Sequence, residues 1–222
     1  RTSHGMILGE NGEKMSKSRG NVVNPDEIIK DYGADTMRVY EMFIGDFEKA
    51  APWSQSSIKG SKRFLDKVWA LYGILCDEKG IRPELEAEFH RTIKKVTEDI
   101  ETLKMNTAIA ALMSLMNSIY STGKITAEEY KIFITLLNPF APHITEEIWE
   151  QIFNKTNSIS KESWPIYDET KTLEETFTMI VQVNGKVRGK IEVSSDTSKE
   201  EMESLAKEID NVKTHIEGKE IV

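Results

Sequence analysis

The chain has 222 residues, of which 39% are hydrophobic and 30% charged, so it can build a real core beneath a well-solvated surface. The formal net charge of −8 argues weakly against nucleic-acid binding, and any contact with phosphates therefore needs local clusters of Lys and Arg. No apolar run is long enough to span a bilayer, no secretory signal pattern is present, and the single cysteine has no partner for an internal disulfide. We therefore expect a cytosolic protein without membrane contact.

The first 45 residues are predicted to form a loop followed by two short helices. Residues 1–23 are rich in Gly, Ser and Lys, as loops commonly are. Asn24, followed by a proline and two acidic residues, predicts a helix start, because Asn caps free N–H groups and the acids meet the positive helix end. Gly33 ends this helix, and Asp35 is expected to cap a second one that runs to about Ile44.

Apolar residues at helical spacing predict several helices between residues 54 and 153. The first is expected to run from a cap at Ser54 to about Asp77. Thr126 and Glu129 form a capping-box pattern for a later helix. Because the connections are short, we predict an antiparallel helical bundle. The apolar stripe of the first helix consists of Ile58, Ser61, Leu65, Val68, Tyr72 and Leu75.

The pattern changes after residue 155. Residues 156–175 are polar and irregular, and we interpret them as a linker. From residue 176 onward, apolar residues alternate on both sides of Asn184-Gly185, which predicts a β-hairpin. A capping-box pattern at Ser198 and Glu201 predicts a helix, and residues 220–222 resemble the start of another strand. The predicted fold class is therefore mainly α, with a small, truncated α+β domain after the bundle.

The register of the hairpin is predicted from the cost of burying charge. A two-residue Asn-Gly turn pairs Val183 with Lys186 and places three cations on the apolar face. A shift by one residue, through a bulge or a longer connection, pairs Val183 with Val187 and Val181 with Gly189 and turns all three cations to the other face. We predict the shifted register, because buried unpaired cations cost more than one bulge. The three cations are Lys186, Arg188 and Lys190.

The most informative stretch is a cationic loop with the sequence Lys14-Met15-Ser16-Lys17-Ser18. Its two ammonium groups can neutralise phosphate charge, and its hydroxyl and backbone N–H groups can donate hydrogen bonds to the same oxygens. Glycines on both sides give the loop conformational freedom. Taken alone, the five residues are more typical of an ordinary solvated loop, so their meaning depends on the sequence around them.

That surrounding sequence resembles the end of the catalytic domain of class I aminoacyl-tRNA synthetases. The loop is followed by Gly-Asn at 20–21, Asn-Pro-Asp at 24–26 and Tyr-Gly-Ala-Asp-Thr-Met-Arg at 32–38. The leucyl branch is indicated by Asn-Pro-Phe-Ala-Pro-His at 138–143 and by Val-Gln-Val-Asn-Gly-Lys-Val-Arg-Gly-Lys at 181–190. The resemblance covers essentially the whole chain.

The resemblance implies an enzyme that joins leucine to tRNA(Leu) with ATP, through an aminoacyl-adenylate, with Mg²⁺ accompanying the ATP. Residues 14–18 would contact ATP, with Lys17 and Lys14 as the catalytic cations. The His-Ile-Gly-His signature of the family, its leucine pocket and its editing domain are absent from this sequence. We therefore expect a fragment that is inactive by itself.

The resemblance also implies a division into domains. Residues 1–45 correspond to the end of the catalytic domain and residues 46–155 to a helical, anticodon-type tRNA-binding domain. After the linker at 156–175, residues 176–222 correspond to part of a C-terminal tRNA-binding domain.

Two groups of cations are candidate tRNA contacts. The first lies on the outer sector of the first long helix, opposite its apolar stripe, and consists of Lys59, Lys62, Arg63 and Lys67. The second lies at alternate positions of one strand and consists of Lys186, Arg188 and Lys190. Each has a structural alternative, a solvated helix face for the first and a charge-protected strand edge for the second. The resemblance favours RNA contact for the second group and leaves the first balanced.

Other interpretations stay open at this point. They are a stand-alone RNA-binding module, a synthetase for isoleucine, valine or methionine, and a purely structural bundle. No spacing of potential ligands predicts a metal site, and His90 and His143 are interpreted as structural. Trp53, Trp69 and Trp149 are expected in the core, and a monomer is expected.

Overall fold

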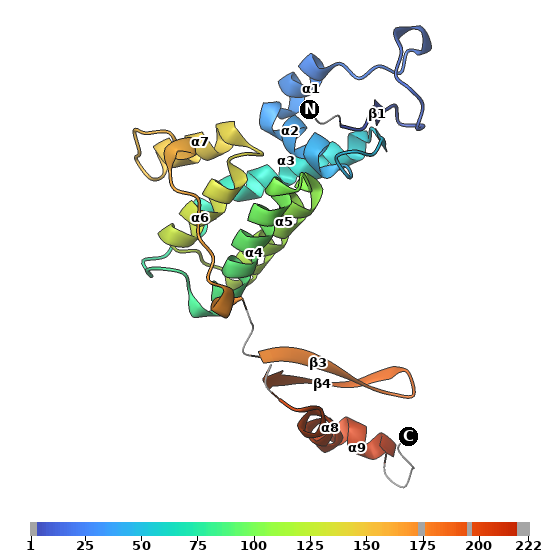
Figure 1. Cartoon of the computed structure of the whole chain (residues 1–222), viewed down its shortest axis with the longest axis vertical. Coiled ribbons are helices and arrows are strands. Elements are labelled where there is room, and N and C mark those ends of the chain that lie inside the picture. Colours follow the sequence, from blue (N-terminus) through green and yellow to red (C-terminus); the bar gives the residue numbers. More distant parts are fainter. Residues whose placement is uncertain (1–3, 173–175, 195–196, 217–222) are drawn as a thin grey trace. The chain divides into compact units, whose positions relative to one another are not determined.

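Helices build most of the chain, and the only other regular structure in the described part is two small two-stranded sheets. A computed structural model describes residues 4–172, 176–194 and 197–216. Contacts divide the chain into an N-terminal unit, Arg1–Asp168, and a C-terminal unit, Glu169–Val222 (Figure 1). The mainly α class with a small sheet is thus confirmed. Among the described helices, none combines the length and apolar character that crossing a bilayer requires.

The N-terminal segment folds as predicted at its first helix. The Asn24 side chain accepts a hydrogen bond from the backbone N–H of Asp26, and Gly33, with φ of 90°, ends the helix. Asp35 does not cap the next helix, because Gly33 already occupies the cap position. The elements of this segment are β1 (Ile7–Leu8), η1 (Lys17–Arg19), α1 (Pro25–Tyr32), α2 (Ala34–Phe43) and β2 (Ala51–Pro52), with β1 and β2 paired in parallel.

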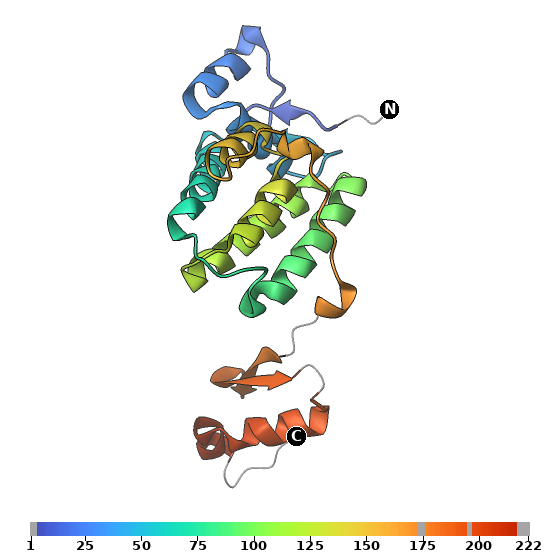
Figure 2. The ribbon, with the colours of Figure 1, turned by 90° about the vertical axis from the view of Figure 1, so that its left-hand side faces the viewer.

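The remaining helices of the N-terminal unit share one large apolar core. Helices α4, α5 and α6 contact one another and lie side by side in both ribbon views (Figures 1 and 2). Three residues of α5 in this core, Ile109, Leu112 and Ile119, are fully buried. The predicted capping box at Thr126 and Glu129 is present. The elements are α3 (Gln55–Ala70), η2 (Leu71–Ile74), α4 (Pro83–Glu101), α5 (Met105–Thr122), α6 (Ala127–Leu137), α7 (Pro142–Gln151) and η3 (Ile159–Lys161).

The first long helix is shorter than predicted. Helix α3 ends at Ala70 instead of running to Asp77, and a 3-10 turn follows it. The chain then pairs with another segment, because the backbone N–H of Cys76 donates to the carbonyl of Ile125 at 2.9 Å. The predicted inward positions of Tyr72 and Leu75 are therefore wrong.

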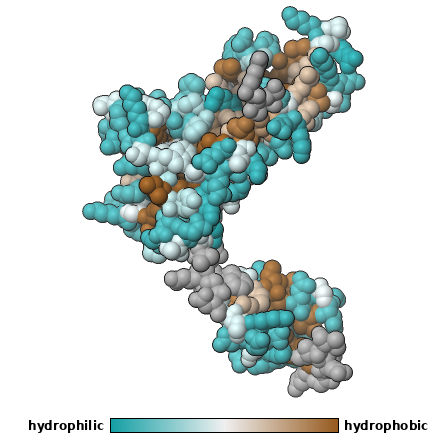
Figure 3. All heavy atoms as spheres, viewed as in Figure 1, coloured by the Kyte–Doolittle hydropathy of each residue, from teal (hydrophilic) through white to brown (hydrophobic). Residues whose placement is uncertain are grey.

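Aromatic side chains divide between core and surface. Trp53 and Trp149 are each 4% exposed, as expected for core residues, whereas Trp69 is 36% exposed and corrects that prediction. Tyr72 is 52% exposed, and its ring meets that of Trp69 edge to face at a centroid distance of 6.5 Å. Figure 3 shows hydrophobic residues as scattered brown areas set within a mainly hydrophilic surface.

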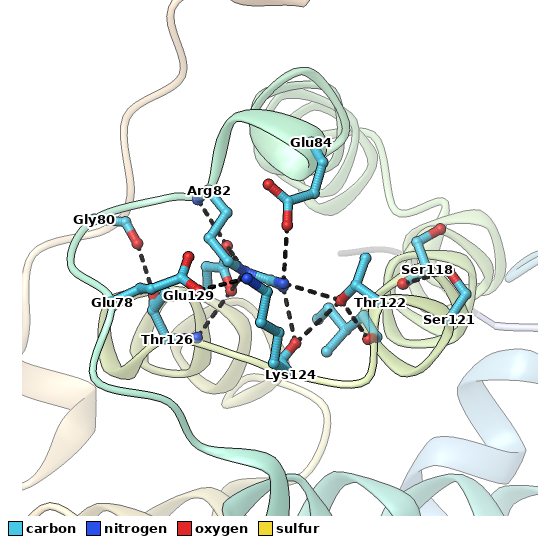
Figure 4. Close-up of polar contacts among 11 residues, drawn as sticks. Glu78, Gly80, Arg82, Glu84, Ser118, Ser121, Thr122, Lys124, Thr126 and Glu129 are labelled. Atoms are coloured by element: carbon cyan, nitrogen blue, oxygen red, sulfur yellow. Dashed lines mark hydrogen bonds and ion pairs between the residues drawn. The ribbon is translucent and has the colours of Figure 1, made fainter.

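A buried ion pair joins the start of α4 to the start of α6 (Figure 4). The Arg82 side chain is 1% exposed, and its Nε donates to both carboxylate oxygens of the fully buried Glu129 at 3.0 Å. The backbone N–H groups of Arg82 and Thr126 also donate to this carboxylate, at 2.8 and 2.9 Å. One capping residue of α6 therefore also neutralises a cation 47 positions earlier.

The rest of the Arg82 guanidinium is satisfied at the same junction. Its Nη1 donates to Glu84 at 3.2 Å and to the Thr122 hydroxyl at 3.1 Å, and its Nη2 donates to the carbonyl of Lys124 at 2.8 Å. A guanidinium with so many partners is held by the ends of three helices, so it fixes their relative positions.

Part of the predicted linker packs against the N-terminal unit. Ile159 is 1% exposed, and the indole N–H of Trp164 donates to the Thr97 hydroxyl on α4 at 2.8 Å. The backbone N–H of Asp168 donates to Nδ1 of the buried His90 at 3.0 Å. His90 thus accepts at Nδ1, in keeping with its interpretation as a structural residue.

The described part of the C-terminal unit consists of a short 3-10 helix, a hairpin and two α-helices. The capping box at Ser198 and Glu201 is present, as predicted. Gly189 lies against these helices so closely that an added Cβ would fall 2.7 Å from the Cδ1 atom of Ile209. The predicted strand start at residues 220–222 lies outside the described residues. The elements are η4 (Glu169–Lys171), β3 (Thr176–Val183), β4 (Lys186–Ser194), α8 (Lys199–Glu208) and α9 (Asp210–Ile216).

The hairpin register shifts, but one pair later than predicted. Val181 pairs with Gly189 as expected, whereas Val183 pairs with Lys186 and not with Val187. Asn184 and Gly185 have φ of 52° and 74°, so they form the strict two-residue turn. The extra residue enters after the turn as a bulge, which restores the register at Val181.

Candidate functional site

The cationic loop is anchored to the N-terminal unit by one apolar side chain. Met15 is partly buried and packs against a small core formed by Ile28, Tyr40, Trp53 and Ile58. Ser16 is half-buried, whereas Lys14, Lys17 and Ser18 are exposed. The methionine therefore fixes the loop while the flanking lysines stay in solvent.

Asn21 closes the loop through its side-chain amide. Its Oδ1 accepts from the backbone N–H of Ser16 at 2.8 Å, and its Nδ2 donates to the carbonyl of Lys14 at 3.3 Å. The hydroxyls of Ser16 and Ser18 lie 3.2 Å apart, so either can donate to the other. These local bonds give the five-residue motif a defined shape.

The two lysines of the motif are available to a ligand. Lys14 and Lys17 are exposed, and neither forms an ion pair within the described residues. The nearby Arg19 is occupied, because its Nη1 lies 3.1 Å from the Glu13 carboxylate. Two unpaired ammonium groups beside hydroxyl donors form a site that favours phosphate oxygens.

The cations of α3 lie on its exposed side, but two of them already have partners. Lys62 pairs with Asp66 one turn later. The Lys67 ammonium lies 5.7 Å from the centre of the Tyr120 ring, whose hydroxyl donates to the Lys67 carbonyl at 2.7 Å. Burial raises the pKa of Tyr120, which keeps this hydroxyl protonated as the donor. The remaining two cations, Lys59 and Arg63, make no ion pair within the described residues.

The hairpin cations do not share one face, which corrects the sequence prediction. Lys190 lies opposite Ile180, whereas Lys186 lies opposite Val183, and these two positions of β3 point to opposite faces. Both lysines are exposed. Arg188 is the bulge residue, and it is half-buried.

Arg188 contributes to the packing of the C-terminal unit, unlike the two exposed lysines on the same strand. Its carbonyl accepts from the Asn211 side chain at 2.8 Å, which joins the bulge to α9. Its Nε is buried without a hydrogen-bond partner in the described chain. A cation placed in this way is a less accessible contact for a phosphate than Lys186 or Lys190.

Sequence reasoning missed the residues that tie the loop-bearing segment to the bundle. Asp35 on α2 accepts from the backbone N–H of Ile144 at 2.7 Å and lies 2.8 Å from Nδ1 of His143. It therefore caps α7, a helix more than 100 positions away. Arg38 donates to the carbonyls of Pro139 and Phe140 at 2.9 and 3.2 Å.

Both partner segments were visible in the sequence only as family signatures. The hydrogen bonds of Asp35 and Arg38 join Gly-Ala-Asp-Thr-Met-Arg at 33–38 to the region of Asn-Pro-Phe-Ala-Pro-His at 138–143. No local pattern signals that these two stretches meet. Within the described residues, no cluster of three or more His, Cys, Asp or Glu is placed to hold a metal ion.

Comparison with known proteins places these features in a family. Residues 83–203, more than half of the chain, match the family model of the anticodon-binding domain of tRNA ligase. The chain belongs to this family. Residues 2–54, which include the cationic loop, match a second family model, that of tRNA synthetases class I (I, L, M and V).

Individual proteins also match this chain over nearly its whole length. A leucine–tRNA ligase of Alkaliphilus oremlandii (strain OhILAs) is 53% identical over 222 residues, and the chain spans 28% of that ligase. Among solved structures, the Agrobacterium radiobacter K84 LeuRS–tRNA–LeuAMS ternary complex matches with a TM-score of 0.75 and 27% identity, over 99% of this chain and 31% of that one. The leucine–tRNA ligase resemblance is thus confirmed.

A more distant structure shares the fold alone. The Mycobacterium tuberculosis methionyl-tRNA synthetase in complex with methionyl-adenylate matches with a TM-score of 0.53 and 18% identity. This match covers 66% of the present chain and 37% of the other.

Proposed function

We propose that this chain is part of a leucine–tRNA ligase and supplies the loop that acts on ATP together with surfaces that hold tRNA(Leu). The observation that carries the proposal is the pair of exposed, unpaired ammonium groups of Lys14 and Lys17 on a loop anchored by Met15. The 53% identity to a leucine–tRNA ligase supports leucine over isoleucine, valine or methionine.

In this proposal the loop stabilises charge on the phosphates of ATP. As leucine attacks the α-phosphate, negative charge builds on the leaving pyrophosphate, and Lys17 and Lys14 neutralise it. The hydroxyls of Ser16 and Ser18 donate to the same oxygens. Mg²⁺ accompanies ATP as part of the substrate, and residues 14–18 contribute cations and hydroxyls to the site.

The proposed domain organisation follows the resemblance. Residues 1–45 are the end of the catalytic domain and residues 46–155 are the helical tRNA-binding domain. Residues 156–175 connect this domain to residues 176–222, which are part of a C-terminal tRNA-binding domain. In support of the first boundary, separate family matches cover residues 2–54 and 83–203. In support of the second, contacts divide the chain after Asp168.

The test of the loop is leucine-dependent ATP–pyrophosphate exchange by the full-length synthetase that contains this chain. Lys17→Ala and Lys14→Ala should each lower kcat by about 10²-fold with little change in the KM for leucine. Lys30→Ala is the matched control, because Lys30 is an exposed lysine on α1 outside the loop. Equal activity of all three variants would disprove the role of the loop. The chain alone is expected to show no exchange.

The proposed tRNA contacts are Lys59, Lys62, Arg63, Lys67, Lys186, Arg188 and Lys190. Their support is position, since all lie on exposed or half-exposed surfaces. Neutralising one phosphate contact should lower the slope of log affinity against log salt by about one. Fluorescence anisotropy with labelled tRNA(Leu) measures this slope, and Lys62, already paired with Asp66, should change it less than Lys59.

The stand-alone RNA-binding module makes a different prediction. Under that alternative the chain binds tRNA with the same salt slope, but it shows no leucine-dependent pyrophosphate exchange when the missing catalytic half is added. A structural bundle without a partner predicts that Lys59→Glu and Lys190→Glu change no affinity. The two assays together therefore separate the three interpretations.

A further inference from the structure

A cleft between α2, α3 and α5 adjoins the cations of α3. Its volume is about 600 Å³, which is within the range of small-molecule sites. The apolar part of its wall comes from Phe43, Phe64, Met113 and Met116. Phe43 is 39% exposed, so part of this side chain is accessible to solvent.

Two polar side chains that line the cleft have no hydrogen-bond partner in the described chain. Ser61 is 2% exposed and lines the cleft, yet its hydroxyl has no hydrogen-bond partner in the described chain. Buried hydroxyls almost always have a partner, so an unpartnered one beside a cleft indicates a missing acceptor or donor. The amide of Asn117 also lines the cleft and makes no hydrogen bond within the described residues.

The charge at the cleft has one sign. Arg63 and Lys67 line it, and no Asp or Glu of the described chain does. Of the two, Arg63 forms no ion pair within the described residues, and its planar guanidinium can donate two parallel bonds to a phosphate. The cleft thus combines an apolar wall that contains an aromatic ring, polar groups without hydrogen-bond partners and two cations. This combination suits a nucleobase with its attached phosphate.

We propose that this cleft receives one unstacked nucleotide of the bound tRNA. The base enters between Phe43 and Met113, its edge bonds the Ser61 hydroxyl and the Asn117 amide, and its phosphate lies at Arg63. The inference rests on the proposed function, because it names a contact of the tRNA that the chain is proposed to hold. The exposed cations of α3, Lys59, Lys62, Arg63 and Lys67, form a ridge proposed to contact the tRNA phosphates. The cleft would add a pocket for one base beside this ridge.

Gly60 allows the cleft to be filled without disturbing the fold. It lines the cleft in the middle of α3, and a Cβ added there meets no atom within 4 Å. Gly60→Leu therefore places a bulky side chain in the cleft and also favours the helix. Gly60→Ala is the matched control, because it removes the same glycine and adds only one methyl group.

The experiment titrates the whole 222-residue chain with a tRNA(Leu) transcript and, separately, with free AMP. Affinity comes from anisotropy, and methyl NMR of the methionines reports on the cleft, since Met113 and Met116 line it whereas Met179 lies on β3. We expect tRNA to shift the Met113 and Met116 signals. Gly60→Leu should weaken binding by about tenfold relative to Gly60→Ala, as the loss of one stacked base predicts, and should abolish those shifts.

Distinct results overturn distinct statements. Tight tRNA binding with unchanged Met113 and Met116 signals, or equal affinity of both Gly60 variants, refutes the cleft and leaves the proposed function standing. No RNA binding at all refutes both. Tighter binding of AMP than of tRNA would mean that the cleft binds a free nucleotide. A lower melting temperature of the full-length Gly60→Leu variant without RNA would mean that another part of the full-length protein fills the cleft.

Discussion

Replacing Arg82 by methionine gives the sharpest test of what holds the helices together. The substitution keeps a long apolar stem but removes the guanidinium bonds to Glu129, Glu84, Thr122 and the Lys124 carbonyl. It leaves the carboxylate of Glu129 fully buried with only backbone donors. Breaking a buried pair in this way costs about 3–5 kcal/mol, a large share of the 5–15 kcal/mol typical of a folded domain.

The assay is urea unfolding followed by tryptophan fluorescence. All four tryptophans lie within residues 1–168, so the signal reports on the N-terminal unit alone. The matched control is Lys124→Met, because Lys124 pairs with Glu78 at the exposed edge of the same cluster. Its loss should change the urea midpoint little, since exposed ion pairs contribute little to stability.

A second substitution separates lost charge from lost packing. Glu129→Gln keeps the capping geometry of α6 but removes the buried negative charge. The double variant Arg82→Met/Glu129→Gln should therefore be more stable than Arg82→Met, with a coupling of at least about 1 kcal/mol. If the double variant is no more stable than the single one, or if Arg82→Met loses no more stability than Lys124→Met, the electrostatic reasoning fails.

Three further outcomes are expected from local contacts. Asp35→Asn should lower the free energy of unfolding by about 1 kcal/mol in the same urea assay, because the α7 cap at Ile144 loses its charge. Gly189→Ala should loosen the C-terminal unit, because the new methyl overlaps Ile209, and the amide NMR signals of α8 and α9 should broaden or shift. Burial raises the pKa of Tyr130 above its ordinary value near 10. The stability linked to its proton is therefore complete below about pH 10 and is lost as the pH rises further. Tyr130→Phe should make the urea midpoint less sensitive to pH in that alkaline range.

The sequence predicted the features that depend on neighbours along the chain. Both capping boxes, at Thr126 and at Ser198, are set by side chains three residues apart, so a pattern of four residues contains the whole interaction. The helix that begins after Asn24 is another case. The cationic loop was equally visible, since its motif is contiguous.

The features that failed depend on partners far away in the sequence. Helix α3 ends at Ala70 because the chain beyond it pairs with Ile125, which no periodicity of α3 can reveal. Asp35 looked like the cap of its own helix and caps α7 instead. Arg82 carries no local sign of burial, because its partner Glu129 comes from another helix.

The hairpin shows a prediction that was right in its physics and wrong in its detail. The charge argument required a register shift, and the structure has one. Its position was set by Asn184 and Gly185, whose positive φ angles favour a two-residue turn and so force the bulge beyond it. The bulge then separates Lys186 from Lys190, which the argument from alternate spacing could not anticipate.

The cationic loop and the ridge of α3 share one support. Met15 packs on the core that contains Tyr40 and Trp53, and the Tyr40 hydroxyl accepts a hydrogen bond from the backbone N–H of Ser54, the cap of α3. The start of the ridge helix is therefore part of the surface on which the loop rests. Among the described residues of the five-residue motif, Met15 is the side chain that packs on this core, and burying a methionine contributes no more than about 3 kcal/mol. The bonds of Asn21 lie within the loop itself. The loop can consequently leave its support without unfolding it, as the proposed closure over ATP requires.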